Sequence, residues 1–274
     1  MKTKEINIKG ATIPALGFGT FQLENDTAET MVKAALDAGY RHIDTAQIYK
    51  NEEGVGRAIA ASDVPREEIF LTTKVWFEKL DKGQFLPSVE ESLKKLQTDY
   101  VDLLLIHWPN PDVPVEEYIG ELMKAQEKGY AKHIGVSNHT TALLDKVLAT
   151  GAKIITNQVE YHPFINQDTL HSYLAQNDIT LTAYSPIAQG KVMGNDTLKS
   201  IGEKYGKNEA QVTLRWMMQQ DGVLAIPRSS KEEHMKANLN IFDFELTADE
   251  MRQVTALKQD DGRIIRPPFA PDWD

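Results

Sequence analysis

Apolar runs and longer amphipathic segments alternate along most of the chain. Runs such as VDLLLI and KIITNQ are continuously apolar over most of their length, which is typical of parallel strands covered on both faces. The pattern predicts strands at residues 15–17, 41–43, 69–73, 101–106, 131–136, 154–158, 179–183 and 222–226. It predicts the helices that follow them at 27–38, 52–61, 85–96, 115–128, 142–149, 167–176, 198–205 and 231–238. Further helices are expected at 210–218 and 247–257, the latter beginning with a Thr cap and early acidic residues.

Eight strand-helix units in sequence favour a closed eight-stranded (β/α)8 TIM barrel, an α/β fold with extra helices near its carboxyl end. Before the first unit, the alternation KEINIK and the segment after Gly10 predict a β-hairpin that could plug one end of the barrel. The alternative is an open doubly wound sheet that binds a dinucleotide through G-x-G-x-x-G. Gly17-Phe18-Gly19 begins that pattern, but position 22 is Gln, so the motif fails. No linker or low-complexity tract divides the chain, and residues 1–274 are predicted to form one domain.

The amino-acid composition excludes several classes of binding partner and site. Hydrophobic residues make up 41% of the 274 residues and charged residues 26%, which are ordinary values for a globular protein with one core. The net charge of −10 argues against nucleic acid or an anionic membrane surface as the main partner. The absence of Cys removes disulfides, thiolate metal sites and a Cys nucleophile. No apolar leader is visible and no apolar run approaches the roughly 18 residues of a membrane span, so we expect a cytoplasmic protein.

Polar and aromatic residues recur just after the predicted strands, and in a barrel the carboxyl ends of all strands meet on one face. The residues at these positions include Gly19, Thr20, Phe21, Asp44, Tyr49, Lys74, Trp76, His107, Trp108, Ser137, Asn138, Gln158, Tyr184, Ser185 and the run Arg228-Ser229-Ser230-Lys231. Each one alone has a structural explanation; Lys74 could be a solvated rim charge and His107 a hydrogen-bonded core histidine. Their coincidence at one end of one barrel favours an active site.

Tyr49, Lys74 and Asp44 together suit proton transfer. A tyrosine hydroxyl has a pKa of about 10, too high for efficient exchange near neutral pH. A neighbouring ammonium would lower that pKa, and a carboxylate would hold the ammonium in place and charged. His107 could hydrogen-bond a substrate oxygen, either as a neutral or as a charged imidazole. G-x-S-x-G and H-E-x-x-H are both absent, so acyl transfer and zinc hydrolysis are disfavoured and no metal is expected.

The run from Arg228 to Lys231 follows the eighth strand at the start of a helix, where backbone N–H groups and the helix dipole favour an anion such as phosphate. The alternative is a solvated helix cap flanked by charges. Tyr184 could stack a flat ligand group, or it could pack in the core.

Over essentially its whole length the sequence resembles the aldo-keto reductases. The resemblance rests on GYRHIDTAQIYKNEEGVG, TTKVW, YVDLLLIHWP, IGVSN, NQVEYHP, TAYSPI and IPRSS. It implies an eight-stranded α/β barrel that transfers hydride from NADPH to an aldehyde or ketone. It assigns Tyr49 as the proton donor, Lys74 and Asp44 as the groups that tune it, and His107 as the group that orients the carbonyl.

The resemblance also assigns a cofactor site. Ser137, Asn138 and Gln158 would bind the nicotinamide carboxamide, Tyr184 would stack on the ring, and Arg228 and Ser229 would hold the 2′-phosphate. The whole predicted cofactor-binding set is Gly19, Thr20, Asp44, Ser137, Asn138, Gln158, Tyr184, Ser185, Arg228, Ser229, Ser230, Lys231, His234 and Asn238.

Two residues depart from the family pattern. His234 stands where an Arg is usual, which would weaken one phosphate or adenine contact, although we retain NADPH over NADH. His139 stands where an aromatic residue is more usual.

The substrate is expected to be a small carbonyl compound. The compact length and the ending APDWD resemble the bacterial 2,5-diketo-D-gluconate reductases, particularly the B type, and the short tail after Pro268 implies an open pocket. Sugar-derived ketones such as 2,5-diketo-D-gluconate, methylglyoxal and small aldehydes then fit as substrates of a monomer. The predicted substrate-binding residues are Phe21, Tyr49, Trp76, His107 and Trp108. An alternative is an NADPH-binding, redox-sensing interaction module on the same barrel, and a third is a phosphate-processing barrel enzyme.

Overall fold

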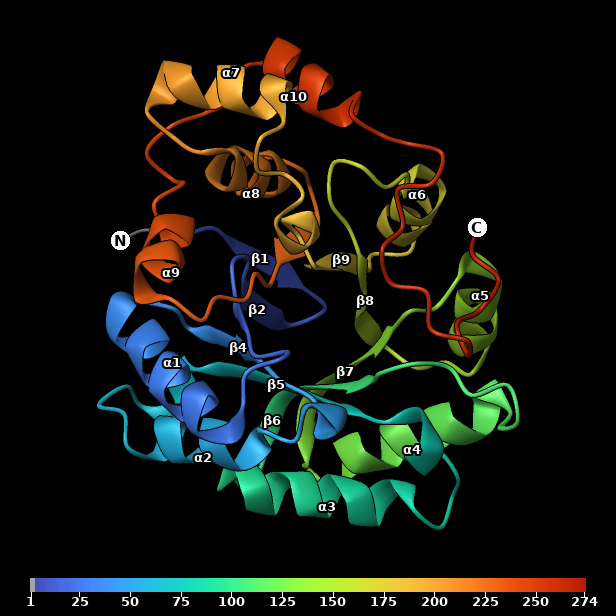
Figure 1. The fold of residues 1–274 in the computed structure, drawn as a ribbon. Helices are drawn as coiled ribbons and strands as arrows, with labels where there is room; N and C mark the ends of the chain where they lie inside the picture. The colour runs from blue at the N-terminus through green and yellow to red at the C-terminus, as the bar shows by residue number, and fades with distance from the viewer. Residues whose placement is uncertain (1–2) are drawn as a thin grey trace.

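Eight parallel strands form a closed ring in the computed structural model, which describes residues 3–274 (Figure 1). The strands are β3 (Phe18–Gly19), β4 (His42–Asp44), β5 (Phe70–Val75), β6 (Val101–Ile106), β7 (Ala131–Ser137), β8 (Ile154–Glu160), β9 (Thr180–Tyr184) and β10 (Val223–Ala225). Neighbouring strands pair in sequence order from β3 to β10. A parallel bridge between Leu16 and Ala225, together with a 2.8 Å hydrogen bond from Gly17 N to Ala225 O, joins the last strand to the segment before the first. The predicted barrel is confirmed.

Helices surround the strand ring. They are α1 (Asn25–Ala38), α2 (Glu52–Ala60), α3 (Phe85–Leu96), α4 (Val115–Glu127), α5 (Thr141–Ala149), α6 (Asp168–Gln176), α7 (Asp196–Tyr205), α8 (Glu209–Met218), α9 (Glu232–Leu239) and α10 (Ala248–Thr255). Both α8 and α10 begin with a capping box, at Asn208 and Thr247, which satisfies free N–H groups at each helix start. The predicted helices at 210–218 and 247–257 are therefore confirmed, each to within two residues at either end.

Three predicted strands end two residues too early; the sixth, for example, extends to Glu160 rather than ending at residue 158. The third strand extends to Val75 rather than ending at residue 73, so Lys74 lies within β5 instead of after it. The first strand is paired at Phe18–Gly19 rather than at 15–17, where Leu16 makes only the closing bridge. These errors have one cause, since the strand ends are set by pairing with neighbours and not by the apolar run itself.

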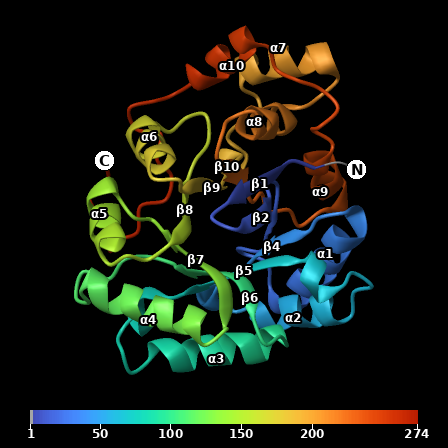
Figure 2. The ribbon, with the colours of Figure 1, turned by 180° about the vertical axis from the view of Figure 1, so that it is seen from behind.

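An antiparallel hairpin of β1 (Glu5–Ile8) and β2 (Ala11–Pro14) lies over the centre of the strand ring (Figure 2). The predicted plug is confirmed, because buried Ala11 and Ile13 pack against barrel-interior side chains such as Leu103 and Leu224. Ammonium groups hold the hairpin at its edges. Lys4 Nζ donates to the carbonyl oxygens of Met218 (2.8 Å) and Gln220 (2.9 Å), and Lys9 Nζ donates to Ile154 O at 3.0 Å. The opposite end of the barrel is thus the open one.

Among residues 3–274, no helix is both long and apolar enough to cross a membrane.

Candidate active site

Strands β4 and β5 place a buried ion pair at the open end of the barrel. Asp44 is the last residue of β4, and Lys74 is the fifth residue of the neighbouring β5. Lys74 Nζ lies 2.5 Å from Asp44 Oδ1, and neither side chain is more than 2% exposed. The same ammonium donates to Thr45 O at 2.8 Å and to the hydroxyl of Tyr49 at 3.3 Å. Asp44, Lys74 and Tyr49 therefore form one hydrogen-bonded chain.

A short 3₁₀ turn, Gln47–Tyr49, carries the tyrosine. Gln47 fixes this turn from both ends of its side-chain amide. Its nitrogen donates to Ser88 O and Ser92 Oγ on α3, each at 3.1 Å, and its oxygen accepts from Trp76 N at 2.9 Å. Rotation of the turn would break all three bonds, so Gln47 holds Tyr49 in place.

The expected lowering of the Tyr49 pKa by Lys74 is wrong. Burial raises the pKa of this phenol well above its usual value of 10.0, and the Asp44 charge raises it further. Burial also lowers the pKa of Lys74, although Asp44 opposes that effect. Loss of solvation disfavours the charged form of each group, and this outweighs the attraction between ammonium and phenolate. Tyr49 is therefore a fully protonated phenol at neutral pH.

His107 follows β6 and lies beside Tyr49, with ring centroids 5.5 Å apart and nearly perpendicular. Trp76 packs on it in the same way, at 5.3 Å. Burial lowers the pKa of His107 well below 6.5, and the Lys74 ammonium lowers it further. The histidine is therefore a neutral imidazole, which resolves the choice that the sequence left open.

A hydrogen-bonded network joins the ends of β7, β8 and β9. Asn138 has a left-handed backbone (φ 61°), and its amide nitrogen donates to His107 O at 2.9 Å and to Ser137 Oγ at 3.0 Å. Its amide oxygen accepts from the Tyr184 hydroxyl at 2.8 Å. Gln158 donates to the second oxygen of Asp44 at 2.8 Å, so the network reaches the ion pair. Hydrogen bonds thus connect the predicted carboxamide-binding residues to the ion pair of Asp44 and Lys74.

A cavity of about 640 Å³ opens onto Tyr49 and His107. Predicted site residues that line it are Gly19, Phe21, Asp44, Tyr49, Trp76, His107, Trp108, Asn138, Tyr184, Ser185 and Arg228. At Gly19 a Cβ atom would lie 2.7 Å from Ile226 O, so only glycine fits that wall. The volume lies within the range of about 300–1,000 Å³ typical of small-molecule sites.

Other predicted residues do not line this cavity. They are Thr20, Lys74, Ser137, Gln158, Ser229, Ser230, Lys231, His234 and Asn238. Thr20, Lys74 and Gln158 lie behind the surface, where each hydrogen-bonds to Asp44.

The predicted anion-binding run lies in the loop that leads into α9. The Ser229 hydroxyl closes that loop by accepting from Lys231 N at 3.0 Å and donating to Lys231 O at 2.7 Å. Ser230, Lys231 and His234 are exposed, whereas Asn238 is buried. The Arg228 guanidinium donates to Gln22 Oε1 across the cavity rim at 2.9 Å. An incoming phosphate would compete with Gln22 for this arginine.

The sequence did not reveal about half of the cavity wall. The missed residues are Gln22, Ile48, Pro186, Ile187, Gln189, Gly190, Ile226, Ile265, Pro267 and Phe269. The last three belong to the carboxyl-terminal tail. Phe269 packs edge-on against Trp76 (5.7 Å between centroids) and Trp108 (5.5 Å). Far from leaving the cavity open on that side, the tail forms one of its walls.

His139 has a structural role. Its Nδ1 lies 2.9 Å from Ser137 O and its Nε2 lies 2.9 Å from the Tyr118 hydroxyl. A proton on Nδ1 satisfies the carbonyl and leaves Nε2 to accept from the phenol, so a neutral ring satisfies both contacts. Burial lowers the pKa of His139 to about 4.

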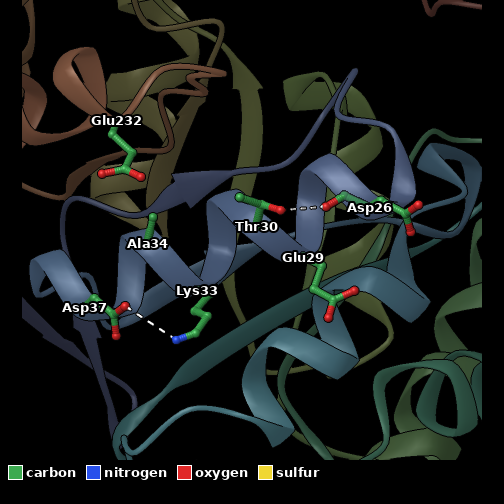
Figure 3. Close-up of a pocket in the computed structure, with 7 residues that line it drawn as sticks. All are labelled: Asp26, Glu29, Thr30, Lys33, Ala34, Asp37 and Glu232. Atoms are coloured by element: carbon green, nitrogen blue, oxygen red, sulfur yellow. Dashed lines mark hydrogen bonds and ion pairs between the residues drawn. The ribbon is translucent and has the colours of Figure 1, made fainter.

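A second depression lies on the outer face of α1, beside α9, and is shown in Figure 3. Carboxylates predominate among its lining side chains, and Lys33 is paired with Asp37. It has neither a buried polar group nor an aromatic wall, so it is a solvated helix face. Among residues 3–274, no group of three or more His, Cys, Asp or Glu side chains could hold a metal ion.

Comparison with known proteins agrees with this geometry. The sequence model described as Aldo/keto reductase family matches residues 15–259. The chain belongs to the aldo/keto reductase family. Methylglyoxal reductase DkgB of Escherichia coli O157:H7 is 44% identical over 266 residues, which cover 96% of this chain and 99% of that relative. Glyoxal reductase of Bacillus subtilis is 45% identical over 254 residues, covering 92% and 91%.

Solved structures of the family are superposable on this chain. A crystal structure provisionally named 2,5-diketo-D-gluconic acid reductase B has a TM-score of 0.98 at 45% identity and covers 100% of this chain and 98% of its own. The Bombyx mori aldo-keto reductase, solved in complex with NADP, has a TM-score of 0.87 at 33% identity, with 94% of each chain covered. As a member of this family the chain is an oxidoreductase, as the resemblance predicted.

Proposed function

We propose that this protein reduces small aldehydes and ketones to alcohols with NADPH, with Tyr49 as the proton donor. The observation that carries the proposal is the hydrogen-bonded chain from Asp44 through Lys74 to Tyr49, ending beside His107 at the surface of one cavity.

The residues present fit a nicotinamide cofactor. Asn138 and the ring of Tyr184 line the cavity close together, which suits a carboxamide and a flat ring. Gly19 lets the Ile226 backbone approach closely in the cavity wall, since a Cβ atom at Gly19 would lie 2.7 Å from Ile226 O. The exposed guanidinium of Arg228 at the rim can pair with a phosphate. The proposal retains the other predicted contacts with the cofactor, those of Ser229, Ser230, Lys231, His234 and Asn238. NADPH supplies a hydride to the carbonyl carbon when it is bound.

The protein's own groups stabilise the charge that develops on the carbonyl oxygen. The neutral imidazole of His107 donates a hydrogen bond to this oxygen and fixes its direction. Tyr49, held protonated by burial, gives the oxygen its proton. The resulting phenolate is paired with the Lys74 ammonium, 3.3 Å from the hydroxyl, which Asp44 keeps in position. Proton transfer thus moves the negative charge from the substrate oxygen to a phenolate that lies beside an ammonium.

The substrate class follows from the cavity wall and from the relatives. Phe21, Trp76 and Trp108 make the entrance apolar, and the tail narrows it. Relatives named methylglyoxal reductase and glyoxal reductase support short dicarbonyl compounds as substrates. Sugar-derived ketones such as 2,5-diketo-D-gluconate are a further candidate, supported by the name of the similar crystal structure.

Replacement of Tyr49 by Phe tests the assignment. The variant should lose methylglyoxal reduction, followed by NADPH absorbance, by about 10³-fold or more, because the proton donor is gone. NADPH binding, followed by fluorescence titration, should stay within about twofold of wild type. Turnover near the wild-type rate would refute the role of Tyr49. Tight NADPH binding by a wild-type protein that reduces no aldehyde or ketone would instead favour the redox-sensing module.

A further inference from the structure

The tail after α10 returns to the open end of the barrel and runs past α6 and α5 (Figure 1). Its first backbone attachment is at Gln259, whose N–H donates to Phe164 O at 3.0 Å in the loop between β8 and α6, and Gly262 lies so close to the same carbonyl that a Cβ atom would be 1.8 Å from it. Its last is at Asp274, whose carboxylate accepts from Thr141 N at 3.0 Å at the start of α5. The tail residues that line the cavity lie between these two attachments.

The central attachment is a single carboxylate. Glu160 is the last residue of β8 and is fully buried. Its Oε1 accepts from Ile264 N at 2.6 Å, and its Oε2 accepts from Ile265 N at 2.8 Å. His162 Nε2 lies 2.9 Å from Oε1 and supports the carboxylate from the barrel side. Two consecutive backbone N–H groups of the tail are therefore held by one side chain of the barrel.

This contact acts directly on the cavity wall. Ile265, whose N–H the carboxylate holds, lines the cavity, and so do Pro267 and Phe269 beyond it. Phe269 in turn packs against Trp76 and Trp108. The nearby Arg263 guanidinium lies 3.6 Å from the centroid of the Trp273 ring, which fixes the end of the same segment.

We propose that Glu160 is a positioning residue for substrate selectivity: its carboxylate sets the distance between the tail wall and the Trp76/Trp108 wall. The inference rests on the proposed carbonyl reduction. Glu160 touches neither the cavity surface nor the catalytic chain of Asp44, Lys74 and Tyr49. Its effect reaches the substrate only through the tail.

Replacement of Glu160 by Gln keeps the shape and leaves one of the two acceptor oxygens. Hydrogen exchange at the Ile264 and Ile265 amides should accelerate at least tenfold, because one N–H loses its acceptor. We expect the ring of an aromatic aldehyde such as 4-nitrobenzaldehyde to contact the tail wall, so its KM should rise about tenfold or more. The KM for methylglyoxal, kcat for both substrates and the NADPH dissociation constant should change by less than about threefold.

Two variants provide controls. Glu250→Gln alters another buried carboxylate that accepts several hydrogen bonds, but on α10 and away from the cavity. It should leave both KM values unchanged. Phe269→Ala removes the wall itself, and should raise the aromatic-aldehyde KM without accelerating exchange at Ile264 and Ile265.

Equal KM increases for both substrates, or unchanged exchange in Glu160→Gln, would overturn the inference. If the Glu160→Gln variant does not fold, hydrogen exchange in the wild-type protein still tests the inference. Exchange at Ile264 and Ile265 as fast as at a solvent-exposed amide would show that the carboxylate does not hold the tail. A wild-type protein that reduces no carbonyl compound would defeat the proposed function, while the exchange measurements would still decide whether the carboxylate holds the tail.

Discussion

The ammonium of Lys74 lies 2.5 Å from the carboxylate of Asp44, and both charges are withdrawn from solvent. Removal of one partner leaves the other charge buried and unpaired, which costs about 3–5 kcal/mol. Lys74→Met should therefore lower the free energy of unfolding, measured with urea, by that amount.

Lys33→Met is the matched comparison, since Lys33 pairs with Asp37 on the exposed face of α1 at 3.8 Å. Its cost should be below about 1 kcal/mol. The double variant with Asp44→Asn and Lys74→Met should cost less than the sum of its two single changes. Equal losses for Lys74→Met and Lys33→Met would contradict the buried pair.

The activity should not change as the pH falls toward the ordinary histidine pKa. Burial and Lys74 lower the pKa of His107 well below 6.5, so the imidazole is already neutral throughout the range between about pH 6.5 and 8. The value of kcat/KM for methylglyoxal should be flat over this range. His107→Gln should lower it by about 10²-fold or more at every pH. A wild-type limb near 6.5 that disappears in His107→Gln would show that the histidine titrates there.

His139 should make the protein sensitive to acid. The folded chain binds a proton at this residue only near pH 4, whereas the unfolded chain binds it near 6.5. The stabilisation is therefore complete above pH 6.5 and declines as the pH falls, by about 2 kcal/mol between pH 6.5 and 5. Urea unfolding of His139→Phe should show a decline smaller by that amount, and a stability lower by about 1–3 kcal/mol at pH 7.5, because Tyr118 loses its partner. If the unfolding free energy of His139→Phe declined with falling pH as steeply as that of the wild type, His139 would not be the cause of the acid sensitivity.

Cofactor preference should depend on Arg228. Loss of a charge-assisted contact to a phosphate costs about 1.5–3 kcal/mol, so Arg228→Ala should raise the KM for NADPH by roughly 10–100-fold. The KM for NADH should change by less than about threefold. His234→Arg, which adds a cation on the exposed face of α9, should favour NADPH further. Parallel increases for both cofactors would mean that Arg228 acts through its bond to Gln22 and not through the phosphate.

Local patterns predicted most of the barrel because its helices and strands differ in apolar period, and they predicted about half of the residues that line the cavity at its open end. Lys74 was misplaced relative to its strand because hydrogen bonding to β6 prolongs β5. The direction in which the Tyr49 pKa shifts depends on burial by segments far away in sequence, which no local pattern reports. The tail wall was missed for the same reason, since Ile265 reaches the cavity through a contact with Glu160, 105 positions earlier.

The hairpin plug has a consequence for the order of folding. Its lysines bind carbonyl oxygens of residues 145 to 216 positions later in the chain. During synthesis the hairpin therefore cannot reach these barrel partners until most of the barrel has been translated. Until then Ile6 and Ile13 have no barrel interior to pack against. The plug can therefore dock only after the barrel segments that follow it in the chain.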